Sequence, residues 1–98
     1  MSKPVVLRRA SREEFDEAAD WYEARQPGLG VPFVAAVQAV FSRISANPQL
    51  HAVVRRDIRK AVVSGYPYNV YYREQVSRVV VIAVFHTSRD PASWQGRN

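Results

Sequence analysis

The sequence has 98 residues, no cysteine and a formal net charge of +5. A chain of this length forms one domain with its own hydrophobic core, and the lack of cysteine excludes disulfides and thiolate metal sites. Residues 1–11 lack the apolar run of a secretory signal, and no stretch approaches the roughly 18 uninterrupted apolar residues of a membrane span. We therefore expect residues 1–98 to form a single soluble domain that resides in the cytoplasm.

The charge is distributed unevenly along the chain. Residues 11–25 carry six acidic and two basic side chains, whereas residues 43–98 carry nine basic and three acidic ones. A basic half of a domain is typical of proteins that bind an anionic partner, either nucleic acid or an acidic protein segment. Many small domains are basic without such a partner, so charge alone leaves both interpretations open.

The first half of the chain predicts a short strand followed by two helices. Residues 5–7 are apolar and include two β-branched valines, and Ser11 with Glu14 matches the capping box that begins a helix. Residues 26–30 contain two glycines and a proline and predict a break before a second helix over residues 31–47. Residues 26–42 contain no charged side chain, so this second helix should be covered on several sides. The two helices are expected to form an antiparallel hairpin that lies across a sheet.

The second half predicts an antiparallel meander of three strands. Residues 48–54 have the character of an irregular connection, and strands are expected over residues 55–64, 68–73 and 78–86. Seven consecutive apolar residues, 79–85, indicate a central strand that is buried on both faces. The predicted fold is α+β and two-layered, with an N-terminal strand, an antiparallel helix hairpin and a three-stranded antiparallel meander.

Few residues are candidates for chemistry. His51 and His86 are the only imidazoles, neither lies at metal-ligand spacing, and no phosphate-binding glycine loop is present, so no metal and no cofactor are expected. His86 is either a catalytic group in RNA cleavage or a strand-end histidine that bonds a backbone carbonyl. The side chains left for binding or cleaving an anion are basic and aromatic: Arg55, Arg56, Arg59, Lys60, Tyr68, Tyr71, Tyr72, Arg73, His86, Arg89 and Trp94.

Motifs spread over nearly the whole chain resemble those of the RelE/ParE superfamily of bacterial type II toxin–antitoxin modules. The motifs are Trp21-Tyr22, Asn47-Pro48, the strand Tyr66-Pro67-Tyr68-Asn69-Val70-Tyr71-Tyr72-Arg73, the ending His86-Thr87-Ser88-Arg89-Asp90-Pro91, and Trp94. The resemblance implies two helices packed on an antiparallel sheet. It also implies a cognate antitoxin, acidic and partly disordered and encoded by an adjacent gene, that folds onto the toxin when it binds.

The superfamily divides by activity. RelE-like members cut messenger RNA on the ribosome, and for that activity the resemblance implies Arg56, Arg59, His86 and Arg89. ParE-like members poison DNA gyrase and lack the cleavage set. Tyr68 stands approximately where RelE-like members have an arginine, so the resemblance favours a ParE-like gyrase poison. A non-toxic relative that only binds its antitoxin is the third alternative.

Under each of the three alternatives the chain can form oligomers with itself or with its antitoxin, and the sequence does not decide between these assemblies. No membrane contact is expected. We expect the surface for a partner or nucleic acid to include the following residues: Arg55, Arg56, Arg59, Lys60, Arg73, Arg89 and Trp94.

Overall fold

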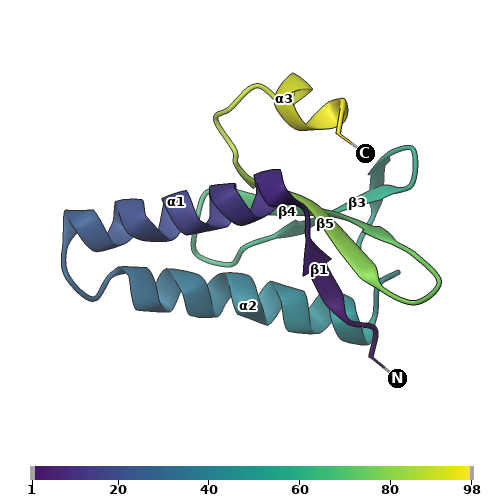
Figure 1. Cartoon of the computed structure of the whole chain (residues 1–98), viewed down its shortest axis with the longest axis horizontal. Helices are drawn as coiled ribbons and strands as arrows, with labels where there is room; N and C mark the ends of the chain where they lie inside the picture. The colour runs from purple at the N-terminus through teal and green to yellow at the C-terminus, as the bar shows by residue number, and fades with distance from the viewer. Residues whose placement is uncertain (1, 98) are drawn as a thin grey trace.

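Two long helices pack as a hairpin against one face of a five-stranded mixed sheet (Figure 1). The computed structural model describes residues 2–97. The elements follow the order β1 (Val5–Leu7), α1 (Arg9–Arg25), α2 (Gly30–Ala46), β2 (Val53–Arg55), β3 (Ile58–Val62), β4 (Tyr68–Glu74), β5 (Val79–His86) and α3 (Ala92–Gln95). The strands are arranged β1-β5-β4-β3-β2, with β1 parallel to β5 and every other pair antiparallel. The predicted α+β fold is confirmed.

The meander contains one strand more than the sequence predicted. Residues 53–54 were expected in an irregular connection and residues 55–57 at the start of a strand, but Val53–Arg55 form β2 and pair with β3. Arg56 adopts a left-handed φ of 54° and, with Asp57, turns the chain back on itself between the two strands. All three residues of β2 are exposed, so no pattern of buried and exposed side chains marks this strand in the sequence.

β5 is buried on both faces, as its apolar run predicted. Toward the helices it packs Val79, Val81 and Val84 against the hairpin. Its other face joins a second cluster that is closed by Trp94 of α3. Tyr71 pairs with Ala83 and Tyr72 with Val81, so a bulge at Ile82 turns both Ile82 and Ala83 to the outer face.

The predicted capping box at Ser11 was wrong. α1 begins at Arg9, and Ser11 lies buried in its first turn, with Oγ 2.7 Å from the carbonyl oxygen of Arg8 and 2.9 Å from that of Val81. Glu14 accepts a hydrogen bond from the backbone N–H of Val84. Because β1 docks beside β5, the first turn of α1 is pressed against β5, and tertiary partners replace the local cap.

Glu23 of α1 organises the tight loop of the hairpin. Its carboxylate accepts hydrogen bonds from the N–H groups of Gly28 at 2.8 Å and Gly30 at 3.0 Å, and these bonds hold the pKa of Glu23 below its ordinary value. A Cβ at Gly30 would lie 3.0 Å from that carboxylate and 3.1 Å from the carbonyl oxygen of Ala19. A larger residue at this position would therefore require α1 and the Glu23 side chain to shift by a few tenths of an ångström. Within residues 2–97, no helix is long and apolar enough to cross a membrane.

The left-handed turn at Arg56 predicts an unusual pair of mutant effects. Arg56→Gly should leave the free energy of unfolding unchanged or raise it by up to about 1 kcal/mol, because glycine adopts a positive φ without steric cost. Arg55→Gly should lower it by about 0.5–1 kcal/mol, because Arg55 has an extended backbone in β2. Urea denaturation measures both values. Equal destabilisation by the two changes would contradict this account of the turn.

Candidate functional site

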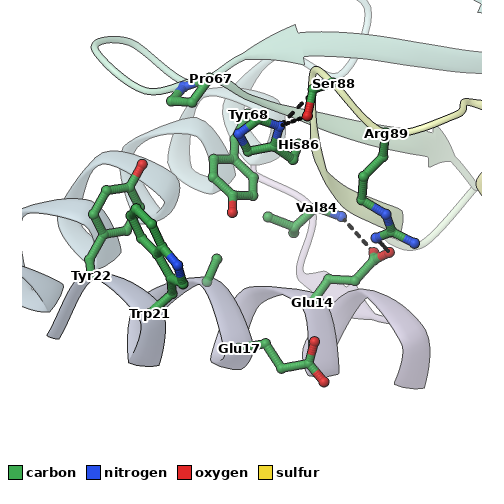
Figure 2. A pocket seen from close by; sticks show the side chains of 11 residues that line it. Glu14, Glu17, Trp21, Tyr22, Pro67, Tyr68, Val84, His86, Ser88 and Arg89 are labelled. Carbon is green, nitrogen blue, oxygen red and sulfur yellow. Dashed lines mark hydrogen bonds and ion pairs between the residues drawn. The ribbon is translucent and has the colours of Figure 1, made fainter. Parts of the chain in front are cut away.

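A pocket of about 470 Å³ lies where α1 faces the start of β4 and the end of β5 (Figure 2). Figure 2 shows Tyr68 reaching from the sheet with its hydroxyl toward α1, while Trp21 and Tyr22 rise from the helix beside it. The pocket is lined by Glu14, Glu17, Ala18, Trp21, Tyr22, Pro67, Tyr68, Val84, His86, Ser88 and Arg89. It is a recess of a size suited to one or two side chains, with aromatic walls and a charged rim.

Aromatic packing holds the walls in place. Tyr22 stacks on Phe33 with 4.9 Å between ring centroids and meets Tyr66 edge-on at 5.3 Å, and Phe33 also meets Tyr68 edge-on at 5.3 Å. Burial raises the pKa of both Tyr22 and Tyr68, so their hydroxyls remain protonated at neutral pH. The pocket therefore presents preformed apolar surface with neutral hydrogen-bonding groups.

The ring of His86 is fixed by its neighbour Ser88. Its Nδ1 accepts a hydrogen bond from the backbone N–H of Ser88 at 3.0 Å and lies 2.8 Å from the Ser88 hydroxyl. A backbone N–H can only donate, so Nδ1 holds a lone pair and the neutral ring carries its proton on Nε2. In this arrangement Nε2 is a donor and has no lone pair with which to accept a proton. The ring thus bonds a backbone amide through Nδ1, and not the backbone carbonyl that the structural alternative for His86 named.

Arg89 is held in an ion-pair network around Glu14. The carboxylate of Glu14, whose side chain is 11% exposed, lies 3.0 Å from Arg89 Nη1 and 2.9 Å from Arg97 Nη2. Arg97 Nη1 bonds the same carboxylate and also the carbonyl oxygen of Ile82. The guanidinium of Arg89 covers the ring of Phe85, with Cζ 4.3 Å from the ring centroid. Glu14 thereby joins α1, β5 and the C-terminal segment.

Arg59 supports the loop that precedes β2. Its Nη1 donates to the carbonyl oxygen of His51 at 2.7 Å and approaches that of Gln49 at 3.4 Å. Tyr72 Oη donates to the carbonyl oxygen of Pro48 in the same loop. The guanidinium of Arg59 is therefore engaged with backbone groups of its own chain.

The residues implied for RNA cleavage lie apart in the fold. His86 pairs with Tyr68 at one end of β4, whereas Arg59 pairs with Tyr72, four residues farther along. At the usual rise of a strand this separation is about 13 Å. Arg56 lies farther still, in the turn between β2 and β3, while Arg89 alone shares the pocket with His86.

The residues expected on a partner surface divide into free and engaged groups. Arg55, Arg56 and Lys60 are exposed. Arg73 pairs with Asp57 through Nε at 2.9 Å. Trp94 is 3% exposed and stacks on Tyr71 with 4.0 Å between ring centroids, so in this conformation it closes the outer core and is not presented to a partner.

The sequence did not identify most of the pocket. Trp21 and Tyr22 were named only among the family motifs, and Glu14 only as part of a helix cap. The available signal was the width of the apolar face of α1: Trp21 lies beside the stripe formed by Phe15, Ala18 and Tyr22, and it remains 53% exposed. Residues 2–97 contain no group of three side chains able to hold a metal ion.

Comparison with known proteins identifies the family. Residues 5–91 match the family model described as the ParE toxin of the type II toxin–antitoxin system parDE. The fold is similar to that of a solved structure titled "Chromosomal ParDE TA system from P. aeruginosa", with a TM-score of 0.77 and 11% sequence identity over 89% of this chain and 98% of that one. No curated protein matches the sequence. The chain belongs to the ParE toxin family of type II toxin–antitoxin systems.

Removing the Glu14 carboxylate should strongly destabilise the protein. We expect Glu14→Gln to lower the free energy of unfolding by about 1–3 kcal/mol, because Arg89 and Arg97 would lose their counter-charge at a nearly buried site. Glu17→Gln is the matched control one helical turn away, and this exposed residue should change stability by less than about 0.5 kcal/mol. Chemical denaturation monitored by tryptophan fluorescence compares the two variants. Equal effects would refute a structural role for Glu14.

His51, in the loop that Arg59 holds, should make the free energy of unfolding depend on pH. Burial, with the nearby Arg43, lowers the pKa of His51 below its ordinary 6.5, and its Nε2 is buried without a hydrogen-bond partner. The unfolded chain therefore binds this proton more readily, so the stability present above pH 6.5 should decline as the pH falls below that value. His51→Asn should remove this part of the decline between about pH 7 and about pH 5, as measured by urea denaturation.

Glu74 provides the control for the pH series. Hydrogen bonds from Lys3 and Gln49 lower the pKa of Glu74 from its ordinary 4.5. Its contribution to stability is present above pH 4.5 and is lost only as the pH falls through the lowered value. Glu74→Gln should leave the slope between about pH 7 and about pH 5 intact. A wild-type slope that persists in His51→Asn would contradict the assignment.

Proposed function

We propose that this chain inhibits bacterial growth in the cytoplasm by poisoning DNA gyrase, and that a cognate antitoxin neutralises it. Membership of the ParE toxin family supports the proposal, because the resemblance noted in the sequence implies gyrase as the target of ParE-like members. Such a toxin acts by binding and needs no catalytic side chains of its own.

The choice of target depends on one observation: most of the candidate cleavage residues already make hydrogen bonds or ion pairs within the chain. Arg59 bonds backbone carbonyls of the loop before β2, Arg89 is paired with Glu14, and His86 presents an N–H at Nε2. RNA cleavage by attack of a 2′-hydroxyl needs a base, an acid and a cation gathered around one phosphate. Here Arg59 lies about a strand length from His86 and Arg89, and Arg56 lies farther still. Arg59, Arg89 and the Nδ1 of His86 are already bonded within the chain. This arrangement supports a toxin that works by occupying its target.

The antitoxin is proposed to be acidic and partly disordered and to be encoded by an adjacent gene. Two features support such a partner. The second half of the chain is strongly basic, and the pocket between α1 and the end of β5 offers a preformed aromatic recess for an anchoring side chain. The segment that binds would become ordered on the toxin, and long-range charge attraction would speed the encounter.

Tightly controlled expression in bacteria tests the target. Gyrase poisoning should produce filamentation, DNA breaks and an SOS response while protein synthesis continues, and purified gyrase incubated with the protein should accumulate cleaved DNA. His86→Ala should remain toxic, because no proton transfer by its imidazole is required. An early halt of translation with cleaved messages and intact DNA, abolished by His86→Ala, would establish the ribonuclease alternative. Folded protein without any growth defect would establish a relative that only binds its antitoxin.

A further inference from the structure

The edge of the sheet formed by β2 has no strand beside it. In the strand order of the described residues β2 is terminal, with β3 as its only neighbour. The backbone N–H and C=O groups along an open edge are available to pair with an added strand. β2 has only three residues, but the loop before it continues along β3, where the N–H of Lys60 donates to the carbonyl oxygen of Ala52.

This edge also concentrates exposed apolar side chains. Leu50, Val53, Val54 and Val62 are 59%, 47%, 46% and 58% exposed, and together they are half of the large apolar residues that are exposed in the described chain. The valines are β-branched residues that favour pairing with another strand. An edge that merely had to stay soluble would carry polar residues at these positions.

The charges beside the edge favour an acidic peptide over a second copy of the chain as the binding partner. Residues 50–62 contain four basic side chains and one acidic side chain, and Arg55, Arg56 and Lys60 are exposed. A second copy of the chain would bring these cations against their own equivalents, which opposes self-pairing. An acidic segment would meet opposite charges and would place apolar residues against the valines. The chemistry of the edge therefore fits an acidic, extended peptide.

We propose that the β2 edge, defined as residues 50–62, binds an acidic segment of the antitoxin as an added strand. The inference rests on the proposed function in taking the antitoxin as the source of that segment. Main-chain hydrogen bonds to β2 supply the pairing, the exposed valines supply apolar contacts, and Arg55 and Lys60 supply the charge selectivity.

The β2 edge is separate from the aromatic pocket. β5, which borders the pocket, is three strand spacings from β2, or about 14 Å. β2 pairs with β3 at Arg59, which in turn pairs with Tyr72, about 13 Å along β4 from the Tyr68 that lines the pocket. One disordered partner segment can contact both surfaces, but changes at one leave the other intact.

Binding of designed peptides to the wild-type protein tests the surface. The probe is the peptide Thr-Glu-Val-Glu-Val-Glu-Thr. Fluorescence polarisation measures its affinity, and backbone NMR of the protein locates where it binds. It should bind with an affinity that falls with salt, and it should shift and protect amides of residues 50–62. A lysine version should not bind up to about 1 mM, and an acidic version with N-methylated alternate amides should lose about tenfold or more in affinity. Binding that survives N-methylation would overturn strand addition.

Charge-reversal variants locate the site. The double change Arg55→Glu with Lys60→Glu should weaken the acidic peptide by about tenfold or more, whereas Arg78→Glu in the exposed turn between β4 and β5 should leave its affinity unchanged. Circular dichroism confirms that each variant is folded. Equal effects of the two charge changes, amide shifts confined to the pocket, or concentration-dependent dimerisation through β2 would each overturn the proposal.

The toxin–antitoxin complex tests the source of the segment. The Arg55→Glu, Lys60→Glu protein should bind the antitoxin about tenfold or more weakly, and should be neutralised less well in cells, than the Arg78→Glu protein. If both are bound and neutralised like the wild type, the antitoxin does not use this edge, although the proposed function stands. If the wild type has no effect on growth but the acidic peptide still binds at β2, the proposed function fails and the surface remains.

Discussion

The fold depends on how β5 satisfies its backbone groups beyond the end of β1. β1 pairs with β5 only as far as Val81, and the rest of β5 would otherwise leave polar groups without partners at a buried edge. Glu14 accepts the N–H of Val84, and Arg97 donates to the carbonyl oxygen of Ile82. A buried backbone group without a partner costs about 1–3 kcal/mol. The side chains of Glu14 and Arg97 therefore supply hydrogen bonds that a neighbouring strand would otherwise make. They also connect the start of α1 to the C-terminal segment.

This constraint decides which charged residues are available to partners. Arg89 and Arg97 are held by Glu14, Arg59 by the loop before β2, and Arg73 by Asp57. The exposed cations that remain include Arg55, Arg56 and Lys60, which lie together at one edge of the sheet. The aromatic pocket lies elsewhere, where α1 faces the start of β4 and the end of β5. The molecule therefore offers a partner two surfaces of different chemistry, one aromatic and one basic with apolar valines.

Sequence patterns predicted the large elements well and the local details poorly. The apolar run 79–85, the Pro/Gly break after α1 and the uncharged second helix each have a direct physical consequence, because burial is encoded by side-chain type. β2 was missed because all of its residues are exposed and its pairing depends on the left-handed turn at Arg56. The capping box failed because Ser11 and Glu14 found stronger partners on β5 than in their own helix.

By itself, the sequence determined the α+β class, the helix hairpin, the doubly buried strand and the family resemblance, since all of these depend on residue type and order along the chain. Tertiary structure alone decided which polar residues are free to act. His86 and Arg89 look like a catalytic pair in the sequence, yet their hydrogen-bond partners, Ser88 and Glu14, come from a local turn and from a helix 75 positions away. Hydrogen-bond capacity is limited, so the Nδ1 lone pair of His86 and the guanidinium of Arg89 are committed to partners within the fold, and that allocation exists only once the chain has folded.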